Sequence, residues 1–67
     1  MTNREVLFEI VRMGNSAKVM AIDSKTMVEV TVVGSAYAHD SQLRAAALQK
    51  LKYVLAKRAN TDTPPDD

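Results

Sequence analysis

The chain has 67 residues, of which 46% are hydrophobic, and a formal net charge of +1. This length and composition fit one small globular domain and exclude a second domain or a wholly disordered chain. The absence of cysteine excludes disulfides, thiolate metal sites and thiol nucleophiles, and it favours a reducing cytoplasm.

The first half of the chain predicts a β-hairpin. Apolar residues alternate over residues 4–13, which is typical of a strand. Gly14 and Asn15 then predict a two-residue turn, because both residue types tolerate positive φ, and residues 17–23 predict the second strand. Direct pairing across this turn defines three cross-strand pairs: Met13 with Ser16, Ile10 with Val19, and Phe8 with Ala21.

A third strand is predicted over residues 27–33, MVEVTVV, after a turn at residues 23–26. Pairing Ile22 with Met27 places the valines of this strand on the same face as the apolar residues of the first two. The predicted neighbours are Val28 beside Ala21, Val30 beside Val19, and Val32 beside Ala17. Gly34 is expected to end the sheet.

The segment GSAYAHDS predicts a connector in which Asp40 or Ser41 caps a following helix. The apolar residues of that helix share a stripe of roughly 140°: Leu43, Ala47, Leu48, Leu51, Val54 and Leu55. This stripe is expected to pack on one sheet face, formed by Val6, Phe8, Ile10, Val19, Val28, Val30 and Val32.

The predicted fold is therefore α+β, a three-stranded antiparallel meander followed by one C-terminal amphipathic helix. The single βββα domain is predicted over residues 1–59. The polar, acidic and proline-bearing tail, residues 60–67, is predicted to be disordered.

The run REVLFEIVRMGNSAKVMAID leads into a valine-rich strand and then into the helix segment ALQKLKYVLAKR. Together these segments resemble a family of very short alphaproteobacterial proteins of unknown function. The resemblance spans nearly all of the chain that is predicted to be ordered. It implies a cytoplasmic bacterial protein with a ββ(β)α arrangement, and it implies no activity and no functional residues.

Residues that could carry chemistry are few. His39 lies beside Asp40, a pair that could orient an imidazole for general-base work, but a capping role explains Asp40 equally well. Asp23, Glu29 and this pair show no spacing typical of metal ligands. The chain also lacks a glycine-rich phosphate-binding loop. We therefore predict no catalytic residue, no metal and no cofactor.

The predicted helix is basic, because residues 41–58 contain no acid. Its basic residues are candidate phosphate contacts, which makes a nucleic-acid-binding accessory protein the alternative function: Arg44, Lys50, Lys52, Lys57 and Arg58. They are predicted to ring the helix rather than to share one face. Lys57 and Arg58 also lie where cations stabilise a helix C-terminus.

The second face of the predicted sheet favours a contact function, since one helix cannot cover both faces. The edge of the third strand is a further contact candidate, because it carries little charge. The candidate dimer contacts are Leu7, Val11, Met13, Met20, Ile22, Met27, Val30, Val32 and Val33. So small a core also favours association, and exchange of a strand or helix between chains is one way to achieve it.

The sequence thus predicts a small non-enzymatic interaction module that acts as a homodimer. A protein partner of unknown identity would be compatible with the same surface. No stretch of the chain approaches the length of a membrane span, and MTNREVLFEI lacks the core of a signal peptide. No membrane partner is expected.

Overall fold

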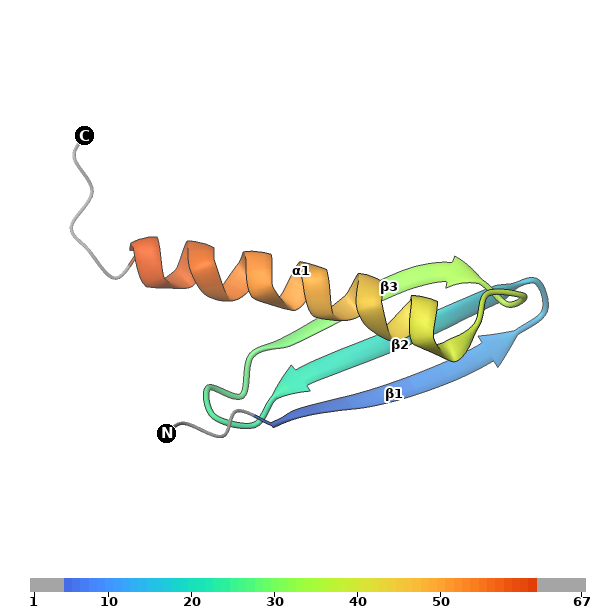
Figure 1. Cartoon of the computed structure of the whole chain (residues 1–67), viewed down its shortest axis with the longest axis horizontal. Helices are drawn as coiled ribbons and strands as arrows, with labels where there is room; N and C mark the ends of the chain where they lie inside the picture. Colours follow the sequence, from blue (N-terminus) through green and yellow to red (C-terminus); the bar gives the residue numbers. More distant parts are fainter. Residues whose placement is uncertain (1–4, 62–67) are drawn as a thin grey trace.

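Three strands and one helix make up the described part of the chain, residues 5–61, in this computed structural model (Figure 1). The elements are β1 (Val6–Met13), β2 (Ser16–Asp23), β3 (Glu29–Ser35) and α1 (Asp40–Thr61). The strands form one antiparallel sheet in the order β1-β2-β3, so β2 is central. The predicted α+β fold, a meander followed by a C-terminal helix, is confirmed.

The β1–β2 hairpin has the predicted turn and the predicted register. Gly14 adopts a φ of 59°, a left-handed conformation that favours glycine, and Asn15 completes the two-residue turn. All three predicted pairs are present: Met13 with Ser16, Ile10 with Val19, and Phe8 with Ala21. A short turn of defined geometry leaves the flanking strands one way to pair.

The register between β2 and β3 differs from the prediction by two residues. Ile22 pairs with Glu29 and not with Met27, and the other pairs shift with it: Ala21 with Val30, Val19 with Val32, and Ala17 with Gly34. Because side chains alternate between faces, a shift of two residues keeps each valine on its predicted face. The predicted faces are confirmed, whereas the predicted partners are wrong.

The turn between β2 and β3 causes this shift, because it is longer than predicted. Asp23 is fully buried, and its Oδ2 accepts hydrogen bonds from the Thr26 backbone N–H (3.0 Å) and hydroxyl (2.7 Å). The Met27 N–H donates to the Asp23 carbonyl at 2.6 Å, and Met27 has a φ of 64°. These contacts hold Thr26 and Met27 in the turn, so β3 begins at Glu29.

Gly34 does not end the sheet, as β3 continues to Ser35. It pairs with Ala17 of β2, and it lies beneath the first turns of α1. A Cβ atom at this position would lie 3.0 Å from Cδ2 of Leu43, closer than ordinary van der Waals contact. Glycine therefore relieves a tight contact where the helix approaches β3, and it does not mark the end of the strand.

The core lies between α1 and one face of the sheet, as predicted. Its buried side chains are Ala17, Val19, Ala21, Val30, Leu43, Ala47 and Leu51. The alanines among them leave room for the helix to pack closely on β2. Half-buried residues surround this cluster: Val6, Phe8, Ile10, Val28, Val32, Ala38, Val54 and Leu55. All predicted sheet residues of the core are confirmed, and Leu48 of the predicted helix stripe is half-buried.

The first turn of α1 is completed by residues other than those predicted. The His39 carbonyl accepts hydrogen bonds from the N–H groups of Gln42 and Leu43, both at 3.0 Å. In return, Oε1 of Gln42 accepts a bond from the His39 N–H at 3.2 Å. This back-bond is half of a capping box, with His39 in the position that the prediction gave to Asp40 or Ser41.

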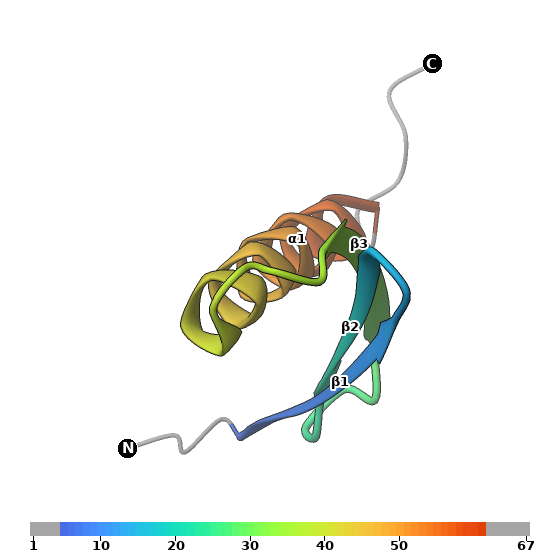
Figure 2. The ribbon, with the colours of Figure 1, turned by 90° about the vertical axis from the view of Figure 1, so that its right-hand side faces the viewer.

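The C-terminal end of α1 is Thr61, which lies beyond the predicted domain end at residue 59. The tail predicted to be disordered begins at residue 60, and from residue 62 onward it lies outside the described residues. Seen from the side, the helix lies against one face of the sheet, and no other described element covers the opposite face (Figure 2).

Candidate interaction surface

The sheet face that α1 leaves uncovered is called here the open face. Side chains alternate along each strand, so this face takes the odd-numbered residues of β1 and β3 and the even-numbered residues of β2. The register arranges them in rows across the sheet: Leu7, Ile22 and Glu29; Glu9, Met20 and Thr31; Val11, Lys18 and Val33; Met13, Ser16 and Ser35.

Large apolar side chains of the open face remain accessible. The exposed fraction is 52% for Leu7, 68% for Met13 and 69% for Val33. Met20 and Ile22 are half-buried by their neighbours on the same face. Exposed apolar side chains that lie together on one surface are typical of a contact surface, whereas scattered ones are ordinary.

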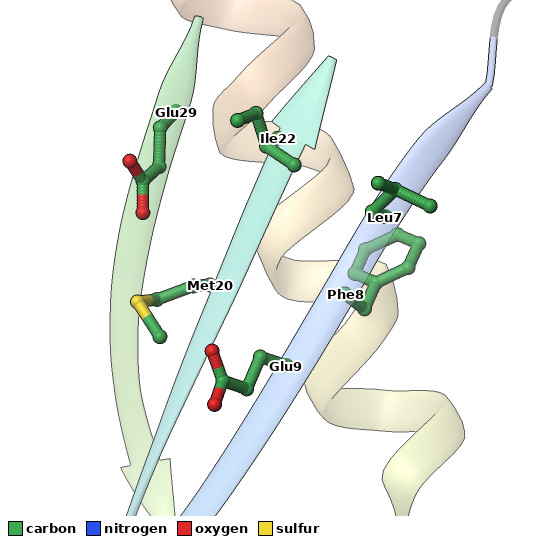
Figure 3. A pocket seen from close by; sticks show the side chains of 6 residues that line it. All are labelled: Leu7, Phe8, Glu9, Met20, Ile22 and Glu29. Atoms are coloured by element: carbon green, nitrogen blue, oxygen red, sulfur yellow. The ribbon is translucent and has the colours of Figure 1, made fainter. Parts of the chain in front are cut away.

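One end of the open face is hollowed. The depression has a volume of about 370 Å³ and is lined by Leu7, Phe8, Glu9, Met20, Ile22 and Glu29. Figure 3 shows the carboxylates of Glu9 and Glu29 on either side of Met20, with Ile22 between Glu29 and Leu7 in the upper part of the view. The depression therefore combines apolar walls with two acidic groups, and it suits a ligand group that is both apolar and cationic.

Three of the predicted contact residues do not belong to the open face. Met27 is exposed in the β2–β3 turn, and Glu29 takes the place beside Ile22 that was predicted for it. Val30 and Val32 lie on the covered face, where Val30 is buried and Val32 is half-buried against the core. Their backbone N–H and C=O groups face β2, so these two residues present no backbone hydrogen-bonding group at the β3 edge either.

The edge of β3 is partly occupied by the helix. The Asp23 N–H donates to the Val28 carbonyl across the sheet. The backbone N–H and C=O groups of the even-numbered residues of β3 therefore point toward β2, and those of Thr31 point outward, away from β2. The Lys50 ammonium donates to that outward Thr31 carbonyl at 3.0 Å. A lysine lying over a strand edge opposes pairing with another strand. The edge is therefore less available than the open face.

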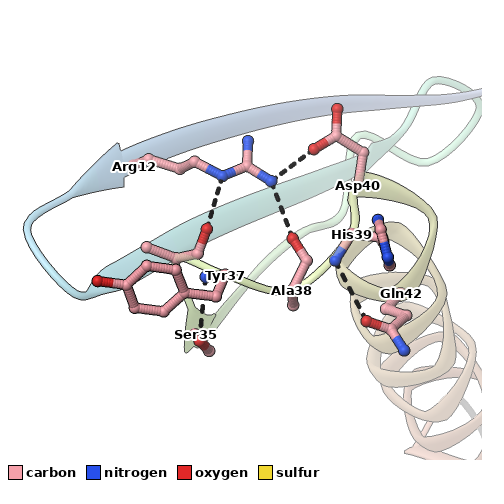
Figure 4. Close-up of polar contacts among 8 residues, drawn as sticks. Arg12, Ser35, Tyr37, Ala38, His39, Asp40 and Gln42 are labelled. Carbon is pink, nitrogen blue, oxygen red and sulfur yellow. Dashed lines mark hydrogen bonds and ion pairs between the residues drawn. The ribbon is translucent and has the colours of Figure 1, made fainter.

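Arg12 is a structural residue that the sequence analysis missed. It lies near the C-terminal end of β1, on the sheet face that α1 covers. Its guanidinium donates to the carbonyls of Ala36 and Ala38, both at 3.1 Å, and to Oδ1 of Asp40 at 2.6 Å (Figure 4). One side chain thus ties β1 to the β3–α1 connector. The signal was an arginine in line with Val6, Phe8 and Ile10, since a charge on a core-facing row needs polar partners.

The Asp40 carboxylate belongs to this Arg12 contact. The hydrogen bond and charge of Arg12 lower the pKa of Asp40 below its ordinary value of 3.8. The hydrogen bonds of His39 among the described residues are made by its backbone. Within residues 5–61, no three histidine, cysteine or acidic side chains come together as metal ligands.

The basic residues of α1 are distributed around the helix, because at about 100° per residue Lys50 and Lys57 share one side and Lys52 lies on another. Lys50 contacts Thr31 at the β3 edge, and Lys57 lies over the Tyr53 ring with its Nζ 5.7 Å from the ring centroid. Arg44, Lys52 and Arg58 are exposed. The structure therefore does not gather these charges into one surface, and nucleic-acid binding stays a prediction.

The comparisons identify a family but no function. Residues 3–58 match the family described as Domain of unknown function (DUF6898), and the chain belongs to this family. This agrees with the resemblance to a small family of unknown function. No curated protein and no solved structure matches the chain. Within residues 5–61, no helix has both the length and the apolar character needed to cross a bilayer.

Proposed function

We propose that this protein is a small non-enzymatic interaction module of the bacterial cytoplasm, and that it acts as a homodimer through the open face. The observation that carries the proposal is the exposure of Leu7, Met13 and Val33 on a single sheet face that no described element covers. Burial of such side chains stabilises a complex in proportion to the apolar area removed from water.

The open face is a better contact than the β3 edge for two reasons. Lys50 already lies against the Thr31 carbonyl, so an incoming strand would have to displace it. The side chains next to that edge, Val30 and Val32, also pack in the core of their own chain. The open face needs no such rearrangement, because its apolar side chains already point outward.

The size of the open face predicts a reversible dimer. Three strands spaced by about 4.8 Å, with a rise of about 3.4 Å per residue, give roughly 400 Å² of projected area per copy. Interfaces of this size fall at the low end for specific complexes. We therefore expect the dimer to dissociate on dilution.

Sedimentation over a dilution series tests this proposal. We expect the mass of the unmodified chain to rise from monomer to dimer with concentration. Leu7→Lys and Met13→Lys should hold the chain in the monomeric form, because each places a charge in the contact. Tyr53→Lys is the matched control, since Tyr53 is 62% exposed on α1 and should leave dimerisation unchanged.

A chain that remains monomeric up to high concentration would overturn the proposal. Equal loss of the dimer in the Tyr53→Lys control would overturn it as well, because the contact would then not be specific to the open face. Circular dichroism of each variant shows whether the fold is retained.

A further inference from the structure

Charge is distributed unevenly along the open face. Glu9 and Glu29 lie in the rows that form the depression, toward the end of the sheet where β1 begins. Lys18 lies in the next row toward the Gly14 turn, between Val11 and Val33, and is exposed. The face is thus acidic and hollow at one end and cationic toward the other.

Two copies of a sheet can stack face to face about 10 Å apart in two simple symmetric ways. A two-fold axis along the strands would place Lys18 over Lys18 of the second copy, which opposes association through repulsion of like charges. A two-fold axis across the strands reverses the strand direction. Each row then lies over a row from the opposite end of the face.

We propose that the open face binds a second copy of this chain about a two-fold axis across the strands, so that Lys18 of each copy enters the acidic depression of the other. In this arrangement the row of Lys18 lies over the row of Glu9 and Met20 of the second copy. Each Lys18 ammonium comes within reach of a Glu9 carboxylate. This inference rests on the proposed function, because it specifies the geometry of the same dimer.

The apolar residues fit the same axis. Leu7 and Met13 lie in the outermost rows at opposite ends of β1. Reversal of the strand direction therefore places Leu7 over Met13 of the second copy at both ends of the contact. A methionine suits this place, because its flexible side chain adapts to the irregular walls of the depression. The depression thus receives a cationic group from Lys18 and an apolar group from Met13 of the second copy.

Charge reversal in mixed samples tests this axis. Alone, Glu9→Lys places a second ammonium group against Lys18 across the interface, and Lys18→Glu places two carboxylates together. We expect each variant alone to dimerise at least about tenfold more weakly than the unmodified chain. An equal mixture of the two restores opposite-charge contacts across the interface, and its dimer should return to within a few-fold of the original affinity.

The mixture separates contacts between chains from contacts within a chain. Glu9 and Lys18 are also diagonal neighbours in the same sheet, but mixing leaves that contact broken in both variants. A control double variant carries Glu9→Lys and Lys52→Glu in the same chain, so that the net charge is restored at an exposed helix position while two ammonium groups still face each other across the interface. We expect this double variant to dimerise as weakly as Glu9→Lys alone.

The outcomes distinguish this inference from the proposed function. If the unmodified chain is monomeric, the proposed function itself fails. If it is dimeric but single reversals leave its affinity unchanged, or the control double variant regains the original affinity, the across-strand axis is wrong and the dimer remains. A tighter dimer in Lys18→Gln would contradict the axis too, because it indicates that the two Lys18 side chains face each other.

Discussion

The central strand β2 presents different side chains to its two faces. Toward α1 it presents Ala17, Val19 and Ala21, all fully buried, whereas the open face receives Lys18, Met20 and Ile22. Small and β-branched side chains have few rotamers, which suits close packing against one permanent partner. Longer side chains can change rotamer to fit a partner, and a charged side chain is well solvated when no partner is bound.

This difference indicates that the two faces have different tasks. The covered face holds the domain together, and a Cβ atom at Gly34 would make a tight contact with the Leu43 side chain there. We expect the open face to contribute little to the stability of a single copy, and its mixed character fits a contact that forms and separates.

Truncation of a leucine should lower the free energy of unfolding far more on the covered face than on the open face. Leu51 is 1% exposed, so Leu51→Ala should lower the free energy of unfolding by about 2–5 kcal/mol through lost burial and the cavity left behind. Leu7→Ala should change it by less than about 1 kcal/mol. Urea unfolding at concentrations where the chain is monomeric measures both. Equal losses would show that the open face also stabilises the single copy.

Added volume should likewise separate the two faces. Gly34→Val forces a side chain against Leu43 and should lower the free energy of unfolding by about 1–3 kcal/mol. Ser16→Val introduces a valine at an exposed β2 residue that points to the open face, and it should be nearly neutral. Thermal unfolding of the two variants compares them. A neutral Gly34→Val variant would mean that α1 can move away from β3.

The pH dependence of the Arg12–Asp40 contact gives the smallest expected effect. Because the folded pKa of Asp40 is lowered, the contact stabilises the fold above about pH 4, and this contribution is lost as the pH falls through the folded pKa. Asp40→Asn should therefore be less stable than the parent near neutral pH, with the difference disappearing in acid. Unfolding midpoints measured from acid to neutral pH test this. A difference that is constant over this range would contradict the contact.

The sequence predicts which face of the sheet each residue occupies better than it predicts which residues are paired across the strands. Alternation alone placed Val30 and Val32 with the core, and the Gly14 turn set the first register correctly. The second register depended on how Asp23 binds Thr26, a buried side-chain contact that no periodicity reveals. The same two-residue shift brought Glu29, which alternation already places on the open face, beside Ile22 in place of Met27, so this neighbour in the depression could not be predicted.

The position of Arg12 shows a second limit of sequence reasoning. Its place on a core-facing row could be predicted, but its partners lie on the connector, at sequence separations of 24 to 28 residues. Such contacts depend on where the helix begins in space. The predicted cap at Asp40 was wrong for this reason. The local sequence predicts that the Asp40 carboxylate caps the N-terminus of the helix, but this carboxylate binds Arg12.

Methyl chemical shifts recorded over a dilution series test the central claim most directly. If the open face forms the contact, the methyl signals of Leu7, Met20 and Val33 will shift together with concentration, while those of Val19 and Leu51 in the core will remain constant. Shifts confined to core or helix methyl groups, or no shift at concentrations where sedimentation detects a dimer, would show that the contact lies elsewhere.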